Sequence, residues 1–166
     1  MMSKTLFALT AGLVWTAVAA PDEVKVSSFG FDAADSTRFL QAAIDSGARR
    51  VIIDKTPTPW ITLPLKGASN QELFFEPGAE LVAKRGEYRD VRDTMFSFEY
   101  ATNVTVVGYG ATLKMWAEDY MSKDYKVSEW RHAFSFLSCE NVKILGLTID
   151  GSGGDGIYLG SRSREH

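Results

Sequence analysis

The sequence has little of what marks several common protein classes. Its single cysteine, Cys139, cannot form a disulfide within the chain, and its apolar surroundings predict a small buried core residue. Lysine and arginine (18) do not outnumber aspartate and glutamate (21), so the formal net charge is −3. Without a basic surplus there is no electrostatic case for a nucleic-acid partner. Beyond the N-terminus, no apolar run approaches the roughly 18 residues that a membrane-spanning helix needs.

The N-terminus has the composition of a secretory signal peptide. Lys4 gives it a positive start, residues 5–16 are mostly apolar, and Ala17-Val18-Ala19 supplies a small-x-small cleavage site. The alternative is a buried N-terminal helix. We expect residues 1–19 to be a cleaved signal peptide, and the mature protein to be secreted, extracellular or periplasmic, with no membrane partner.

One helix is predicted, within a cap segment of residues 20–50. Apolar residues recur at helical spacing over residues 36–46, Asp35 or Ser36 offers an N-cap oxygen, and Gly47 suits a left-handed C-cap. Residues 24–26 alternate in the manner of a strand before it. No comparable helical signal follows, so residues 51–166 are expected to be mainly β.

A repeat dominates the second half of the chain. Phe-Ser-Phe at 96–98 returns at 134–136, and Asn103-Val104 returns as Asn141-Val142, in both cases 38 residues later. A shorter echo takes Gly-Ala-Glu-Leu at 78–81 to Gly-Ala-Thr-Leu at 110–113. Fixed offsets of this kind are typical of stacked repeats. Asn103-Val104-Thr105 also fits a glycosylation acceptor, although the repeat favours a turn asparagine.

Short β runs separated by glycine or asparagine fill residues 51–166. Around Gly146 the inward alternation resets, which indicates two strands meeting at a sharp bend rather than one long strand. Three short strands per turn predict the coils of a parallel β-helix, whereas a Greek-key sandwich is the rival that leaves the repeat unexplained. The candidate strands are 51–53, 61–65, 73–75, 81–83, 95–98, 104–107, 112–115, 134–137, 142–145, 147–149 and 157–159.

Five motifs together carry a family resemblance: Val26-x-x-Phe-Gly, the helix with its caps at 35–47, Pro-Gly-Ala-Glu-Leu at 77–81, Glu-Asn-Val-Lys-Ile at 140–144 and Gly-Gly-Asp-Gly-Ile at 153–157. They resemble the N-terminal portion of the pectin-lyase-like superfamily. The resemblance implies a right-handed parallel β-helix, a solenoid with a short N-terminal capping helix. Because such solenoids stack more coils than the three or four counted here, we expect a chain truncated at its C-terminus and a monomer at full length.

The same resemblance implies a carbohydrate-active protein. The leading expectation is a polysaccharide lyase or glycoside hydrolase that acts on a uronate-containing or other cell-wall polysaccharide. The alternative is a non-catalytic carbohydrate-binding or surface-adhesion β-helix protein. The hydrolase signatures of the superfamily (Asn-Thr-Asp, Asp-Asp, Gly-His-Gly and Arg-Ile-Lys) are absent from residues 1–166, and Gly154-Asp155-Gly156 only faintly resembles the first.

The segment 116–132 packs aromatic and charged residues between the two copies of the repeat. Aromatic rings can stack on sugars, Arg131 can bind a carboxylate through two hydrogen bonds, and His132 can titrate near neutrality. The alternatives are a loop that merely covers the coil and a structural salt bridge from Glu129 to Arg131. The predicted substrate-binding residues are Trp116, Tyr120, Tyr125, Glu129, Trp130, Arg131 and His132.

Asp150 and Asp155, on either side of a glycine-rich turn, are the candidate catalytic residues. Hydrolysis of a glycosidic bond needs one protonated and one ionised carboxyl group. Elimination from a uronate needs a basic side chain and charge neutralisation, so Ca²⁺ is a possible cofactor of a lyase; no other metal or cofactor is expected. Aspartates beside glycines are also common turn formers.

Overall fold

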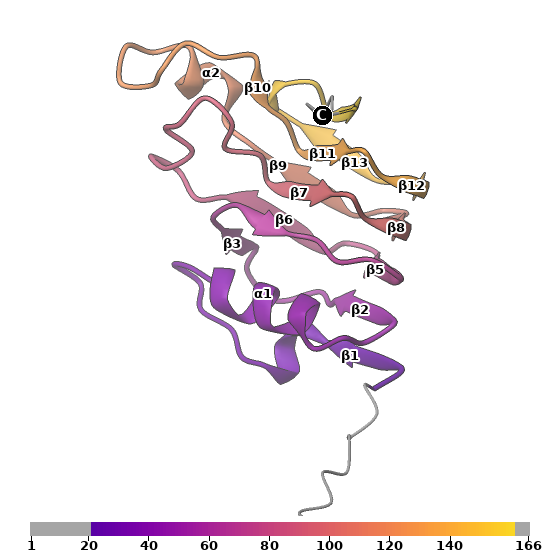
Figure 1. Cartoon of the computed structure of the whole chain (residues 1–166). Coiled ribbons are helices and arrows are strands. Elements are labelled where there is room, and N and C mark those ends of the chain that lie inside the picture. Colours follow the sequence, from indigo (N-terminus) through magenta and orange to yellow (C-terminus); the bar gives the residue numbers. More distant parts are fainter. Residues whose placement is uncertain (1–20, 162–166) are drawn as a thin grey trace, which may run out of the picture.

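The chain passes repeatedly through three sheets of parallel strands, stacked coil upon coil (Figure 1). The computed structural model describes residues 21–161. Sheet A contains β1 (Glu23–Lys25), β2 (Arg50–Ile53), β5 (Gln71–Phe75), β8 (Thr102–Val107) and β12 (Glu140–Leu145). Sheet B contains β3 (Trp60–Thr62), β6 (Glu80–Ala83), β9 (Thr112–Lys114) and β13 (Thr148–Asp150). Sheet C contains β4 (Leu65–Lys66), β7 (Phe96–Glu99), β11 (Phe134–Leu137) and β15 (Ile157–Gly160).

The sequence repeat is the register of neighbouring coils. In sheet C, Phe96 pairs with Phe134 and Phe98 with Phe136, and in sheet A Val104 pairs with Val142. The shorter echo does the same in sheet B, where Leu81 of β6 faces residue 113 of β9. Residues at the same repeat position therefore lie one above another, and the prediction of stacked coils is confirmed. The parallel pairing of all three sheets also excludes the Greek-key sandwich, whose strands are antiparallel.

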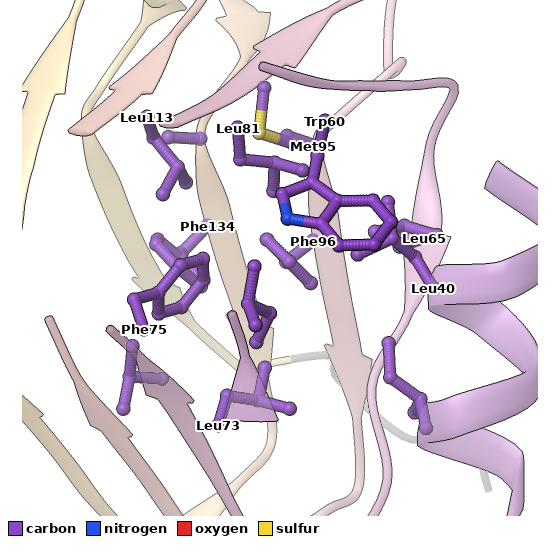
Figure 2. Close-up of a cluster of buried hydrophobic side chains, with 14 of the residues drawn as sticks. Leu40, Trp60, Leu65, Leu73, Phe75, Leu81, Met95, Phe96, Leu113 and Phe134 are labelled. Atoms are coloured by element: carbon purple, nitrogen blue, oxygen red, sulfur yellow. The ribbon is translucent and has the colours of Figure 1, made fainter. Parts of the chain in front are cut away.

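The core lies between the sheets, where inward-facing rings of successive coils stack. The ring centroids of Phe96 and Phe134 are 5.0 Å apart, and those of Phe98 and Phe136 are 4.7 Å apart. All four side chains are buried, so truncation of one to alanine costs about 3–5 kcal/mol. Figure 2 shows the centre of this cluster, with labels on Leu40, Trp60, Leu65, Leu73, Phe75, Leu81, Met95, Phe96, Leu113 and Phe134.

Helix α1 (Thr37–Asp45) lies against the first coil (Figure 1). It contacts β2, β3, β4 and the short 3-10 helix η1 (Val26–Ser28), and it buries Leu40, Ala43 and Ile44. The helix lies within the predicted range 36–46. Of the two expected caps, Asp35 provides the side-chain oxygen, because its Oδ1 accepts a hydrogen bond from the Thr37 amide at 3.0 Å.

Among residues 21–161, no helix is long and apolar enough to span a membrane.

A ladder of asparagines stands where the chain enters the strands of sheet A. Asn70, Asn103 and Asn141 all have φ between 53° and 57°, a left-handed conformation that asparagine tolerates. Asn103 Nδ2 donates to Asn70 Oδ1 at 2.8 Å, and Asn141 Nδ2 donates to Asn103 Oδ1 at 2.7 Å. The expected turn asparagine at 103 is instead the second residue of β8, and Asn141 is the second residue of β12. The bend predicted at Gly146 is confirmed, since φ there is 71° and β12 ends just before it.

Some strands differ from the prediction. The expected strand 61–65 is wrong, because β3 ends at Thr62 in sheet B and β4 begins at Leu65 in sheet C. The periodicity also missed β10 (Trp130–Arg131) and β14 (Gly153–Gly154), which pair antiparallel and are only two residues long.

Cys139 is half-buried rather than fully buried, with its Sγ 3.5 Å from the carbonyl oxygens of Phe98 and Leu137.

The last coil has an open face. Its strands β12, β13 and β15 stand at the edges of their sheets. Ile157 and Leu159 are 41% and 69% exposed, although their register partners Phe134 and Phe136 in the coil below are fully buried. Leu145 at the end of β12 is 43% exposed. Apolar side chains of the last coil are thus partly uncovered within the described residues.

Candidate functional site

An open pocket of about 310 Å³ lies on the outer face of sheet C. Its volume is at the lower end of the range for ligand sites, about 300–1,000 Å³. We call it the sheet C pocket. Its walls come from the segment before β7, the segment before β11 and the last coil. The lining residues are Arg92, Thr94, Ser97, Glu99, Trp130, His132, Ser135, Leu137, Tyr158 and Ser161.

The floor of the pocket follows from strand alternation. Because the phenylalanines of β7 and β11 face the core, the residues between them face outward. Ser97 lies beside Ser135, and Ser135 lies beside Tyr158, in three neighbouring strands of sheet C. Serine hydroxyls and a tyrosine thus form one row across three coils. Ser97 Oγ donates to the Leu65 carbonyl at 3.2 Å, which anchors one end of that row.

One wall pairs an aromatic ring with a cation. Trp130 is 51% exposed, and the Arg92 guanidinium lies 5.0 Å from the centroid of its ring. Arg92 is itself exposed. The Trp130 backbone is fixed by its pairing with Gly154 and by a hydrogen bond from its amide to Ser128 Oγ at 3.0 Å. An apolar face and a delocalised cation therefore stand together at the pocket, held by a rigid backbone.

The other wall is a stacked pair of rings. His132 and Tyr158 lie nearly parallel, with an interplanar angle of 6° and centroids 4.9 Å apart. His132 is only 4% exposed, and its Nδ1 is buried with no hydrogen-bond partner among the described residues. Burial lowers the pKa of His132, while the carboxylate and backbone carbonyl of Asp155 act in the opposite direction. The imidazole is therefore favoured in its neutral form near neutral pH.

Arg131 faces away from the pocket. Its Nε donates to the Tyr88 carbonyl at 2.6 Å, and its Nη2 donates to the carbonyls of Arg89 and Lys126 at 3.1 and 2.8 Å. The side chain is fully buried, so a substrate carboxylate has no surface by which to reach it. These contacts give Arg131 a structural role, and they also replace the salt bridge to Glu129 that was the alternative.

The other aromatic residues of segment 116–132 also lie outside the pocket lining. Tyr120 and Tyr125 pack edge to face at 5.3 Å under the guanidinium of Arg131, and burial raises the pKa of Tyr120 to about 12. Trp116, half-buried near α2 (Ala117–Tyr120), donates through Nε1 to the Ala83 carbonyl at 2.7 Å. Of the seven predicted binding residues, the structure brings only Trp130 and His132 to the pocket; Glu129 is exposed beside them.

The two candidate catalytic aspartates lie in different elements, one at the end of a strand and the other in a turn. Asp150 ends β13 in sheet B, where it pairs with Lys114 and is exposed. Asp155 is exposed in the turn before β15 and interacts electrostatically with His132. Neither residue lines the pocket, in which Glu99 is the carboxylate among the described residues. Their catalytic role stays a prediction.

A calcium site is not built by the part of the chain that the structure describes. No group of three or more histidine, cysteine, aspartate or glutamate side chains within residues 21–161 is placed to hold a metal ion. The side chains present therefore do not fit the Ca²⁺ that a lyase could use, and we assign no step to a metal.

Several pocket residues were missed from the sequence. Arg92 and Thr94 lie in a segment without periodicity, so nothing local marks them. Ser97, Ser135 and Tyr158 could have been found, because the repeat fixes the register and the phenylalanines fix which positions face outward. The predicted binding residues were all placed in segment 116–132, and none was placed on the strand face.

Comparison with known proteins supports the fold. No family model matches the chain, and no curated protein does. Among solved structures, an iota-carrageenase complexed to iota-carrageenan fragments is similar, with a TM-score of 0.60 and 18% identity over 84% of this chain and 33% of that one. A second is a 1,3-alpha-1,4-beta-D-galactose-4-sulfate-3,6-anhydro-D-galactose-2-sulfate 4 galactohydrolase, with a TM-score of 0.60 and 19% identity over 84% of this chain and 35% of that one. The chain spans about a third of each neighbour. At these identities the likeness supports a parallel β-helix fold.

Proposed function

We propose that this chain is part of a secreted, carbohydrate-active β-helix protein of the pectin-lyase-like type, and that the sheet C pocket binds its polysaccharide. The observation that carries the proposal is the pocket itself, in which an exposed tryptophan, an arginine, hydroxyl groups and a histidine converge on one face of sheet C. The polysaccharide lyases and glycoside hydrolases named in the sequence analysis are the enzyme classes that this proposal retains.

The pocket has the chemistry that sugars require. A tryptophan ring can stack on the apolar face of a pyranose, and the serine and threonine hydroxyls can exchange hydrogen bonds with sugar hydroxyls. The Arg92 guanidinium adds donors suited to a carboxylate or sulfate substituent. This combination favours an acidic polysaccharide over a neutral one.

The two structural neighbours support a carbohydrate-active hydrolase at a coarse level. One is named as a complex with iota-carrageenan fragments, and the other as a galactohydrolase of a sulfated galactose polymer. We therefore add sulfated galactans to the uronate-containing polysaccharides as candidate substrates. Secretion depends on the signal peptide predicted at residues 1–19, which lies outside the described residues.

A second candidate is a non-catalytic binder, as the sequence analysis also allowed. The positions of Asp150 and Asp155 favour it, because neither carboxylate lines the pocket and hydrolysis requires two that flank the bond. A further coil stacked on β12, β13 and β15 would extend sheet C and cover Ile157 and Leu159, and it could bring additional groups to the same face.

A panel of polysaccharides tests the proposal. The protein is mixed with a polyuronate, a sulfated galactan and a neutral glucan, and binding is followed by retardation in polysaccharide-containing gels. Turnover is followed by reducing ends, and elimination by absorbance of the unsaturated product. Binding of an acidic polymer without turnover would favour the binder, turnover would favour the enzyme, and no retardation by any polymer would contradict the proposal.

Substitution of Arg92 tests whether the pocket itself binds the acidic polymer. Arg92→Met keeps the stem against Trp130 but removes the charge, so affinity for the acidic polymer should fall about tenfold or more. Arg38→Met is the matched control, because Arg38 lies 4.4 Å from the Phe39 ring on α1, outside the pocket. Equal affinity of the two variants would remove Arg92 from the site.

A further inference from the structure

His132 stands apart from the other pocket residues because it is a titratable side chain that is almost fully buried. A side-chain carbon on Gly154 of β14 would lie 3.0 Å from its Nδ1 and 2.0 Å from the Glu129 carbonyl oxygen. Only glycine fits there. The imidazole therefore lies between Gly154 and the stacked ring of Tyr158, and it is part of the pocket lining.

The charged groups near His132 come from three elements. Asp155, in the turn before β15, favours the protonated imidazole. Arg92, from the segment before β7, and Glu99, on β7, line the same pocket with opposite charges. Glu129 precedes β10 and is exposed, while Arg131 turns into the protein interior. Burial outweighs the attraction of Asp155 in the empty pocket, so the imidazole there is a neutral group that can gain a charge.

We propose that the His132–Tyr158 wall holds an anionic substituent of the sugar, a carboxylate or a sulfate, and that binding it brings a proton onto His132. This inference rests on the proposed function and assigns both the substrate class and a pH dependence to the same pocket. An anion beside the imidazole favours the imidazolium, since the two charges meet in a partly enclosed site. The bound complex then has two cations, Arg92 and His132, facing the acidic sugar.

The sign of the pH dependence follows from linkage. An anion raises the pKa of His132 above that of the empty pocket, so the complex holds more protons than the free protein between the two values. Affinity for an acidic oligosaccharide therefore rises as pH falls through that interval, by up to about tenfold per pH unit. A neutral oligosaccharide shows no such rise.

Calorimetry tests the proton directly. A sulfated galactan oligosaccharide, whose sulfates do not titrate near neutrality, is titrated into the protein in buffers of different ionisation enthalpy. We expect uptake of a fraction of one proton per site at about pH 6 and almost none at about pH 8. His132→Gln should bind without proton uptake. Binding by the unchanged protein with no uptake at any pH would overturn the inference and leave the proposed function intact.

A pair of exposed aspartates provides the control. Asp155→Asn removes the charge that favours the imidazolium, so the interval of proton uptake should move to lower pH while affinity at about pH 8 stays unchanged. Asp124→Asn, outside the pocket lining, should leave both unchanged. Both sites are exposed, so this comparison remains decisive even if His132→Gln fails to fold. Identical uptake profiles in the two variants would contradict the inference, whereas failure of every acidic ligand to bind would contradict the proposed function itself.

Discussion

Single residues where the chain enters sheet A fix how one coil sits on the next. Asn103 illustrates this, because its amide donates to the asparagine below it and its carbonyl oxygen accepts from the asparagine above. Its φ of 56° would strain most residues with a side chain. Asn103 therefore links the coils by hydrogen bonds and also adopts the left-handed backbone conformation that this position requires.

Replacing Asn103 separates these two contributions. Asn103→Gly removes the two hydrogen bonds and should lower the free energy of unfolding by about 1 kcal/mol. Asn103→Ala also places a side chain at positive φ, so it should cost about 1 kcal/mol more than the glycine variant. Urea unfolding of the two variants measures the difference. An alanine variant as stable as the glycine variant would show that this position carries no left-handed strain.

Side-chain direction within segment 116–132 could not be predicted from the sequence. Trp130, Arg131 and His132 are adjacent, but the middle one points into the protein and the outer two reach the pocket. That alternation is set by the pairing of β10 with β14, which lies more than 20 residues further along the chain. Two-residue strands leave no periodicity to detect, and the arginine was therefore assigned to the substrate.

At the scale of elements, the segment between β9 and β11 is held by one buried cation. Arg131 Nε and Nη2 donate to three backbone carbonyls, and two tyrosine rings lie beneath the guanidinium. Gly153 of β14 adjoins the same unit, because a side-chain carbon there would lie 2.4 Å from the Tyr120 ring. The wall that carries Trp130 and His132 is thus supported from behind.

The planar geometry of Arg131 should be essential to this support. Arg131→Lys keeps the charge but cannot reach three carbonyls at once, so we expect the free energy of unfolding to fall by about 2–3 kcal/mol. Arg85→Lys is the control, because Arg85 pairs with Asp119 at the surface and the same change there should cost less than about 1 kcal/mol. Denaturant unfolding compares them. Equal losses would mean that the buried hydrogen bonds add nothing beyond a surface pair.

The sequence predicted most of the elements in the coils, because hydrophobic alternation and repetition are local signals. The strands of the 38-residue repeat pair as the offset requires. The segment 61–65 was one exception, since Leu63 and Pro64 form a corner between sheets B and C while the apolar run continues through it. Apolar residues on both sides of a corner have the same pattern as one strand.

At the scale of the whole molecule, the stacking of coils creates the candidate site. The sheet C pocket takes its floor from β7, β11 and β15 and its walls from segments more than 25 residues apart. None of these residues forms a motif, so the sequence predicted the fold but only two members of the pocket. The site becomes visible once the coils are placed in register.

The open end of the stack belongs to this scale as well. Figure 1 shows β12 and β13 at the end of the stack opposite α1. The pocket lies at this end, since Tyr158 of β15 is part of its lining. A polysaccharide longer than the pocket would continue along the outer face of sheet C in either direction.

The binding of an acidic polysaccharide to matched tryptophan and tyrosine variants tests the central proposal most directly. Trp130 lines the pocket, whereas Tyr109, 62% exposed, lies in the turn between β8 and β9 outside it. We predict that Trp130→Ala lowers the affinity for the polymer at least tenfold, because the stacking face is lost, and that Tyr109→Ala leaves affinity within about twofold. Equal affinity of both variants, with the unchanged protein binding tightly, would place the polysaccharide elsewhere on the molecule.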